Sequence, residues 1–228
     1  MQNTDFLMAL IFIHLLSDFV FQTSKLAESK AKSIKGLLTH VTIVFIVNLV
    51  FLFNYGLIGE IVAVITTATH FIIDYTKMKT KMYYKITSIH SLIDQIIHFV
   101  VIIICDYCFR NMVNEPIIKL EYIGTLNYLI IITYVATVIA KMVLCDICEN
   151  KSISCDFFKK YERLFDSIII LAIVFSFINT ILGIIVLVIA ATVFFFVDIN
   201  YFKYSQKQTI LKATIYLIFV CAFRFLVN

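Results

Sequence analysis

The sequence is poor in proline, glycine and charge. Only one proline and five glycines occur in 228 residues, and no stretch is low in complexity, which excludes disordered, collagen-like and linker-rich chains. Charged residues make up 15% of the chain and hydrophobic residues 61%, whereas a soluble domain has about 25% and about 45–50%. Because so few charges cannot surround so large an apolar core, we expect lipid to cover much of the surface.

Several familiar functional signals are also missing. The formal charge of +4 is too small to indicate a nucleic-acid surface, so no nucleic-acid partner is expected. There is no GxSxG turn, HExxH helix or phosphate-binding glycine loop. The first apolar run lacks the basic start and the cleavage site of a signal peptide, so we expect it to stay in the mature protein.

The apolar residues form about eight runs, each of roughly the 20 residues that cross a bilayer. They lie near residues 5–24, 36–55, 58–77, 87–109, 125–146, 163–178, 181–200 and 209–226. The sequence therefore predicts an all-α protein, a polytopic transmembrane helical bundle. We predict a four-helix half over residues 1–112 and a four-helix C-terminal membrane half over residues 113–228, together forming one compact unit.

Lysine and arginine gather in alternate connections between these runs. The basic clusters lie near residues 25–35, 77–85, 151–163 and 203–212. Under the positive-inside rule these connections face the cytoplasm. The pattern predicts a multi-pass protein of the cell (inner or plasma) membrane with both termini extracytoplasmic; it does not indicate an oligomeric state.

All five histidines lie in the first half of the chain, and three are followed by an aspartate four residues later. The pairs are His14/Asp18, His70/Asp74 and His90/Asp94, and His98 follows Asp94 by another four residues. Residues i and i+4 share one face of a helix, so each pair can present imidazole and carboxylate to one ion.

Depth in the membrane links these pairs to His40. At about 1.5 Å per residue, the five histidines and three aspartates occupy one slab roughly 5–16 Å below the cytoplasmic surface. An ionisable group inside a bilayer costs on the order of 2.5–3.5 kcal/mol on insertion scales and usually faces a partner or a cavity. We therefore expect one shared polar site.

Imidazole and carboxylate together suit zinc, manganese or iron better than Mg²⁺ or Ca²⁺, and eight groups suffice for one or two ions. The preferred ligands are His14, Asp18, His70, Asp74, Asp94 and His98. The remaining candidates are His40 and His90 for general acid or base catalysis, Gln22, Gln95 and Glu162 for orienting ligands or a water, and Arg163 for holding an anionic substrate. A proton relay, or hydrogen bonds that only fasten helices together, remain alternatives.

These residues also carry a family resemblance. The segments HLLSDFVFQT (residues 14–23), HFIIDYTK (70–77) and DQIIH (94–98), with His40 between them, resemble a bacterial polytopic membrane family known as domain of unknown function 3307. Glu162 and Arg163 look like a Glu-Arg pair of that family. The resemblance implies the fold and a membrane location, and no activity. Histidine and aspartate near the cytoplasmic face are also similar in style to membrane-bound metal-dependent hydrolases.

Three functions agree with these features. The first is a metal-dependent hydrolase of a lipid-linked or phosphorylated substrate, in which the ion polarises a phosphoryl or carbonyl oxygen and activates a water. The second is a metal-ion or proton-coupled transporter, and the third a non-enzymatic structural membrane protein. The polar groups stop near mid-membrane, which favours the hydrolase.

Overall fold

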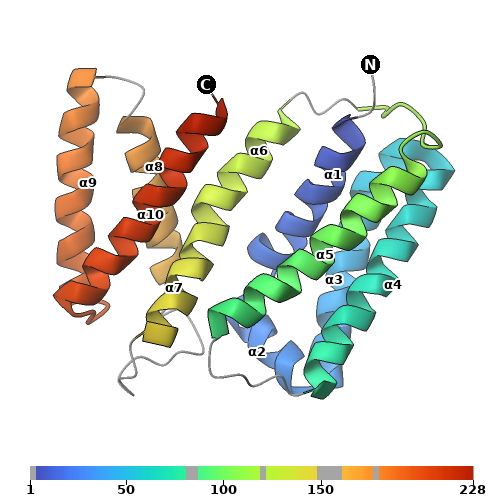
Figure 1. Ribbon diagram of the computed structural model, residues 1–228, viewed down its shortest axis with the longest axis horizontal. Helices are drawn as coiled ribbons and strands as arrows, with labels where there is room; N and C mark the ends of the chain where they lie inside the picture. The colour runs from blue at the N-terminus through green and yellow to red at the C-terminus, as the bar shows by residue number, and fades with distance from the viewer. Residues whose placement is uncertain (1–3, 81–86, 119–121, 148–160, 177–179, 228) are drawn as a thin grey trace. The chain divides into compact units, whose positions relative to one another are not determined.

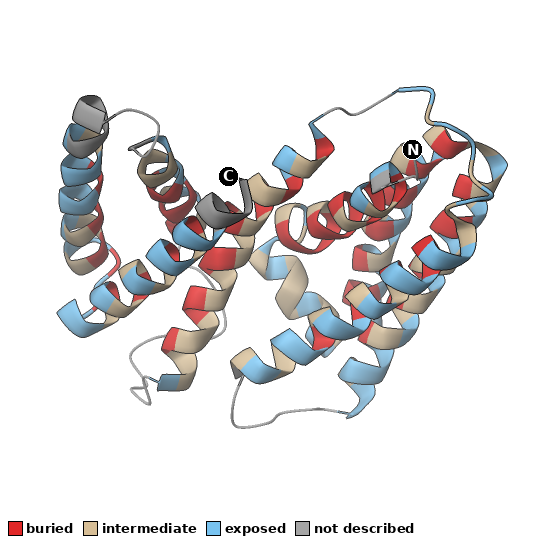
Figure 2. Cartoon of the chain, turned by 45° about the horizontal axis from the view of Figure 1, so that its top comes forward, coloured by how far each residue is buried: buried red, intermediate tan, exposed pale blue. Residues whose placement is uncertain are grey.

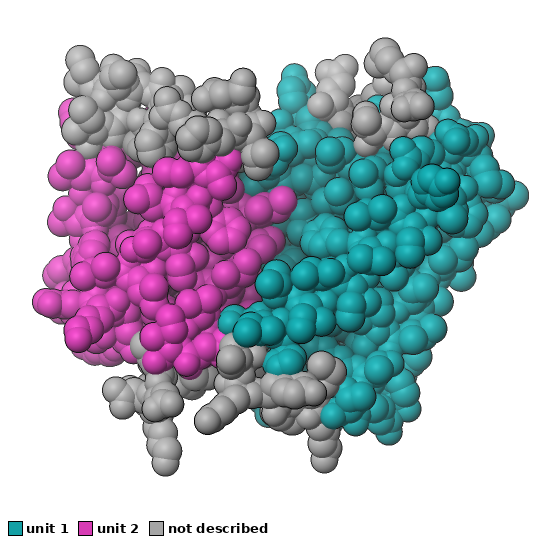
Figure 3. Space-filling view, viewed as in Figure 1, with its two compact units in different colours: residues 1–130 teal, residues 131–228 magenta. Residues whose placement is uncertain are grey.

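The computed structural model describes residues 4–80, 87–118, 122–147, 161–176 and 180–227. Within these ranges all of the regular structure is helical and no strand occurs (Figure 1). The predicted all-α class is therefore confirmed. The chain divides into two compact units, residues 1–130 and 131–228 (Figure 3).

Unit 1 holds the segment in which all the histidines lie. Its helices are α1 (Thr4–Leu15), the π-helix η1 (Leu16–Val20), α2 (Ser24–Lys32), α3 (Ile34–Leu52), the 3₁₀-helix η2 (Phe53–Tyr55), α4 (Gly56–Thr80), α5 (Thr87–Phe109) and α6 (Ile123–Ile130). α3 packs against α4, and α4 against α5 (Figure 1). Buried residues concentrate on α1, which contacts α3, α5 and α6 (Figure 2). The first four predicted apolar runs coincide with α1 and η1 together, α3, α4 and α5.

Helix α2 is an element that the sequence analysis did not predict. The chain bends by 90° between Asp5–Val20 and Ser24–Lys32, and the Thr23 hydroxyl caps α2 by accepting the Leu26 N–H. Its sequence, SKLAESKAK, contains no apolar run. Its lysine, alanine, leucine and glutamate residues nevertheless favour a helix, and packing on α3 adds to its stability.

Unit 2 contains the π-helix η3 (Ile131–Val135), α7 (Ala136–Ile147), α8 (Glu162–Ser176), α9 (Thr180–Asn200) and α10 (Gln206–Val227). α8 packs against α9, and α10 against α7. The long apolar stretch from Phe165 is divided between α8 and α9, in agreement with the two runs predicted near 163–178 and 181–200; residues 177–179 lie outside the described residues.

Large apolar side chains cover much of the outside of the long helices. Leu38, Ile46 and Val50 on α3, Val64 on α4 and Ile103 on α5 are all exposed. Within the described part of the chain, three helical segments, Ile34–Thr80, Ser88–Phe109 and Ile123–Ile147, are long and apolar enough to cross a membrane, and the bent pair ending at Lys32 makes a fourth if counted as one span. Apolar residues outside and charged residues inside indicate membrane association.

Candidate metal centre

Four ligand-type atoms from three neighbouring elements converge in unit 1. They are Asp18 Oδ1 from η1, His40 Nε2 from α3, and His70 Nε2 and Asp74 Oδ2 from α4. We call this set the four-atom centre. All four side chains are buried, and His40 has no exposed surface.

The separations within the four-atom centre are nearly equal. The two imidazole nitrogens lie 3.0 Å apart. His40 Nε2 lies 3.3 Å from Asp18 Oδ1 and 3.5 Å from Asp74 Oδ2, and His70 Nε2 lies 3.4 Å from each of the same oxygens. Ligands of a tetrahedral zinc ion with bonds of about 2.0–2.1 Å lie roughly 3.3–3.4 Å from one another. Five of the six separations among the four atoms are therefore of the size found between ligands of one ion. Two groups of three, His40/His70/Asp74 and His14/Asp18/His70, each bring ligand atoms within 4.8 Å of one another.

Hydrogen bonds satisfy the atoms of the centre only in part, with one between His40 Nε2 and His70 Nε2. Asp18 Oδ1 is buried and accepts no well-oriented hydrogen bond from any described residue, although two imidazole nitrogens lie within 3.4 Å of it. Only one proton can lie between the facing His40 and His70 nitrogens, so they form at most one hydrogen bond with each other. Buried polar atoms rarely lack a partner, and a cation between these four atoms would supply one.

Two further histidines lie beside the centre, on α1 and α5. The ring centroid of His98 lies 4.4 Å from that of His70 and 5.2 Å from that of His14. His98 Nδ1 lies 2.8 Å from the Asp94 carbonyl oxygen, so this nitrogen carries the proton and Nε2 keeps its lone pair. Nε2 is buried and has no hydrogen-bond partner among the described residues. His14 Nε2 donates to Gln95 Oε1 at 3.0 Å.

Two lysines neutralise carboxylates at this level of the unit. Lys30 Nζ, on α2, lies 3.1 Å from Asp74 Oδ2, the same oxygen that faces the imidazoles. Burial by itself lowers the pKa of Lys30, but the carboxylates of Asp74 and Asp18 raise it above its ordinary value, so Lys30 is an ammonium at neutral pH. Lys77 Nζ lies 2.6 Å from Asp94 Oδ2, which makes Asp94 an ion-pair partner outside the four-atom centre.

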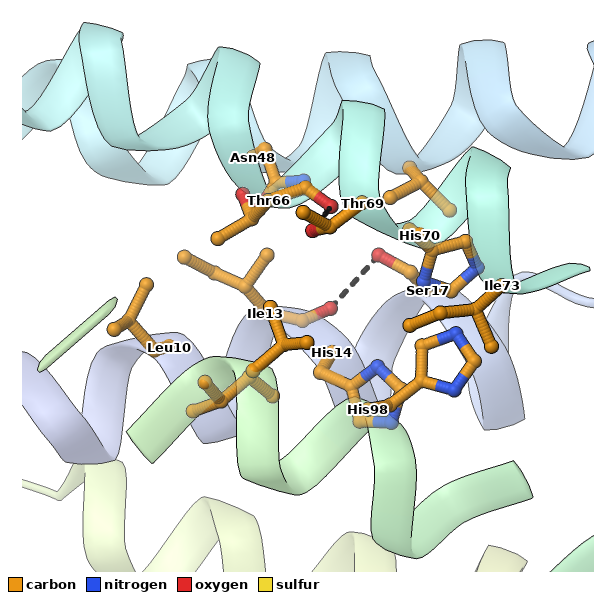
Figure 4. Close-up of a pocket in the computed structure, with 13 residues that line it drawn as sticks. Leu10, Ile13, His14, Ser17, Asn48, Thr66, Thr69, His70, Ile73 and His98 are labelled. Atoms are coloured by element: carbon orange, nitrogen blue, oxygen red, sulfur yellow. Dashed lines mark hydrogen bonds between the residues drawn. The ribbon is translucent and has the colours of Figure 1, made fainter. Parts of the chain in front are cut away.

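A cavity of about 30 Å³, enough for one or two waters, adjoins the centre. His14, Ser17, His70 and His98 line one end (Figure 4), where the Ser17 hydroxyl donates to the Ile13 carbonyl at 2.8 Å. The other end is lined by apolar side chains, among them Leu10 and Val44, and by the polar side chains of Asn48, Thr66 and Thr69. Because His70 belongs to both, a molecule in the cavity would lie next to an ion in the centre.

The structure gathers most of the predicted site residues and leaves others elsewhere. His14, Asp18, His40, His70, Asp74 and His98 lie together, and Gln95 binds His14. His90 is half-buried on α5, outside the four-atom centre, and Gln22 lies in the connection before α2.

Two predicted residues belong to unit 2. The Arg163 guanidinium lies 4.7 Å from the Tyr134 ring centroid, and Glu162 lies within 3.5 Å of Lys141 and Lys212. Their predicted roles at the metal centre stay predictions.

Sequence reasoning missed Lys30 at the site. Lys30 was interpreted as part of a basic loop that reports topology, because only the bend before α2 brings it to Asp74. The sequence around Lys30 has no apolar periodicity and gives no local indication of this contact.

The comparisons with known proteins give one result. The model of a family described as "Protein of unknown function (DUF3307)" matches residues 6–126. This range contains η1, α3, α4 and α5, and so every residue of the four-atom centre. No curated protein and no solved structure matches the chain.

Proposed function

The chain belongs to the DUF3307 family, whose function is unknown, and on that premise we propose that it is a multi-pass integral membrane protein with a metal centre in unit 1. The ligands are Asp18, His40, His70 and Asp74. This assigns His40 to the ion, in place of the proton-transfer role expected from sequence. Asp94 instead pairs with Lys77 and accepts a hydrogen bond from His98.

One observation carries the proposal, namely five separations of 3.0–3.5 Å among four buried ligand atoms. Two imidazoles and two carboxylates suit Zn²⁺, Mn²⁺ or Fe²⁺. With Lys30 beside them, the two carboxylates leave one uncompensated negative charge, which also attracts a cation.

We propose that the ion is catalytic and that the reaction is hydrolysis of a phosphorylated or lipid-linked substrate. A bound metal ion would polarise the substrate oxygen and lower the pKa of a water. The cavity beside His70 offers space for that water. His98 Nε2, with its lone pair free, is the group best placed to accept a proton from that water.

With four protein ligands, the ion would have no free coordination position for water unless one ligand leaves. Catalytic zinc usually keeps one position for water beside three protein ligands. Asp74 Oδ2 already interacts with Lys30 at 3.1 Å, so Asp74 is the ligand that leaves most easily. The three remaining ligands, Asp18, His40 and His70, then form a site with an open position.

A transporter is the second candidate, and a specific observation favours it. The cavity continues from the histidines to Asn48, whose amide donates to Thr67 Oγ1 at 3.0 Å. Polar groups beyond an ion site are typical of a permeation pathway. A closed set of four ligands also suits a cargo ion that is released by ligand exchange.

Metal content tests the centre itself. Detergent-purified protein, prepared without chelator, is expected to contain about one transition-metal ion per chain. His70→Asn is expected to lose it, while Asp94→Asn, whose carboxylate pairs with Lys77, keeps it. An empty parent protein, or equal metal in His70→Asn and parent, would show that the proposed site is wrong.

Activity assays separate the two functions. The same preparation is assayed for hydrolysis of phosphate monoesters and, in liposomes, for zinc flux. A hydrolase loses turnover in His98→Gln while keeping its metal, whereas a transporter shows flux and no hydrolysis. A metal-loaded protein with neither activity would contradict both functions and leave only a structural role for the centre.

A further inference from the structure

Unit 2 contains its own buried charge cluster, on helices that carry no histidine. Lys212 Nζ on α10 lies 2.9 Å from Asp166 Oδ2 on α8 and 3.0 Å from Asp198 Oδ1 near the end of α9. The Asp166 and Asp198 side chains have no exposed surface, and that of Lys212 is 1% exposed. We call these three residues the Lys212 triad.

Each aspartate of the triad uses only one oxygen for Lys212. The other oxygens, Asp166 Oδ1 and Asp198 Oδ2, are buried and accept no hydrogen bond from a described residue. Thr209 Oγ1, one turn before Lys212 on the same face of α10, is also fully buried and lies beside Asp198 without a well-formed hydrogen bond to it. Three buried oxygens without a well-formed hydrogen bond therefore accompany one ammonium.

Among the described residues, the neighbouring groups do not supply the missing positive charge. Glu162 lies 3.5 Å from both Lys212 and Lys141 and also bonds the Tyr204 hydroxyl, so this added carboxylate comes with a second cation, Lys141. Burial, and then the Glu162 carboxylate, raise the pKa of Tyr204 above its ordinary value, so this phenol stays neutral. The Tyr216 hydroxyl donates to Asp166 Oδ2 at 2.8 Å.

Other basic residues on these helices are Arg163 on α8, and Lys207 and Arg224 on α10. The Arg163 guanidinium is placed over the Tyr134 ring, away from the ion pairs of Lys212. The triad by itself, two carboxylates and one ammonium, therefore has a formal charge of −1. A buried uncompensated charge is costly, and proteins usually neutralise it by binding a proton.

We propose that the Lys212 triad is a proton-binding site, in which Asp166 and Asp198 hold one exchangeable proton on their free oxygens. A proton from water adds to one carboxylate oxygen to give a carboxylic acid, and no other reactant is needed. The acid then donates to the buried oxygens that lack a donor. Ionisable groups of this kind inside a membrane commonly form proton relays. The site is independent of the metal centre, since all of its residues belong to unit 2.

Infrared difference spectroscopy on the full-length protein tests this proposal. At neutral pH the parent is expected to show the C=O band of a protonated carboxyl group, shifted by exchange into D₂O. Asp198→Asn and Asp166→Asn should each remove this band, because the remaining aspartate and Lys212 are then balanced. Tyr216→Phe is the matched control, because it removes a hydrogen bond without changing the charge and should keep the band.

Two outcomes would overturn the proposal. One is a parent spectrum without a protonated carboxyl, which would mean that Arg163 or a bound inorganic cation balances the triad; this result is decisive even if a variant fails to fold. The other is a band that persists in both asparagine variants. Size-exclusion chromatography in detergent identifies a misfolded variant. If one asparagine variant does not fold, the other one is sufficient for the test, because each is expected to remove the band.

Discussion

Asp74 is the residue on which two kinds of cation compete. Its Oδ2 atom faces the Nε2 atoms of His40 and His70 and also the ammonium of Lys30. A metal ion in the centre would lie close to that ammonium, and two positive charges in a poorly solvated region repel each other. If an ion binds in the centre, Lys30 therefore weakens its binding and makes the bond from Asp74 to the ion easier to break.

The competition predicts the effect of removing Lys30. We expect Lys30→Met to bind zinc about tenfold more tightly, which corresponds to about 1.4 kcal/mol, because the ammonium no longer occupies Asp74. Lys77→Met is the control, since Lys77 pairs with Asp94 outside the centre. Competition with a zinc chelator measures both affinities. Weaker zinc binding in Lys30→Met would mean that Lys30 positions Asp74 rather than competing for it.

At the scale of elements, the π-helix η1 and the bend after it organise the centre. The Phe21 N–H donates to the Leu16 carbonyl five residues back, at 2.9 Å, so the last turn is wider than an α-helical turn. The chain then turns into α2, and Ser33 begins α3 by accepting the Gly36 N–H. These local features carry Asp18 and Lys30 to α4.

The contact between α2 and α3 depends on Gly36. A Cβ atom there would lie 2.3 Å from the backbone carbonyl oxygen of Ser29 on α2. We expect Gly36→Ala to destabilise the protein by about 1–3 kcal/mol and to loosen α2. Gly124→Ala is the control, because its Cβ would meet nothing within 4 Å. Thermal unfolding in detergent, together with protease cleavage of α2, measures the difference; equal stability of the two variants would contradict this packing.

At the scale of the whole molecule, the described helices have an apolar exterior and charged interiors in both units. His40 and Asp74 in unit 1 are as buried as Asp166 and Asp198 in unit 2. Water does not favour this arrangement, whereas lipid does, because apolar side chains can face the hydrocarbon while polar groups pair inside. The pattern supports the proposed multi-pass insertion.

Topology is the prediction that belongs to this scale. We expect a fluorescent protein that folds only in the cytoplasm to be active when inserted after Lys32 or Lys207, and inactive when inserted after Met112 or joined to Asn228. The reason is that the basic connections stay inside. A periplasmic phosphatase at the same positions should give the opposite result. Fluorescence from the fusion at Asn228 would mean that the number of spans is odd.

Much of the fold was predictable because apolar runs of span length leave few alternatives. The runs near 36–55 and 87–109 became α3 and α5 with ends shifted by only a few residues. Helix α2 was not predicted, because a search for apolar runs of span length passes over a nine-residue polar helix, even one rich in helix-forming lysine and alanine. The i, i+4 pairing of His70 with Asp74 was correctly expected to share a face, since a regular helix fixes that spacing.

The site was predictable as a set of residues and not as a geometry. Histidine and aspartate stand out in an apolar chain because each is costly in lipid, so their identities point to a shared site. Which of them converge depends on the π-helical turn at Asp18 and on the packing of α3 against α4, neither of which has a local signal. The Lys212 triad was missed for a related reason, because Asp166, Asp198 and Lys212 come from three helices and form no motif.

The amino-acid sequence by itself determined the helical class, the lengths of the helices and the residue types available for an ion, because hydrophobicity and helical periodicity are local properties. Only the tertiary structure decided that His40 faces His70 at 3.0 Å, that Lys30 shares Asp74 with them, and that Lys212 joins two aspartates in unit 2. Such contacts depend on distances of a few ångströms between segments far apart in the chain, and those distances are set by how the helices pack.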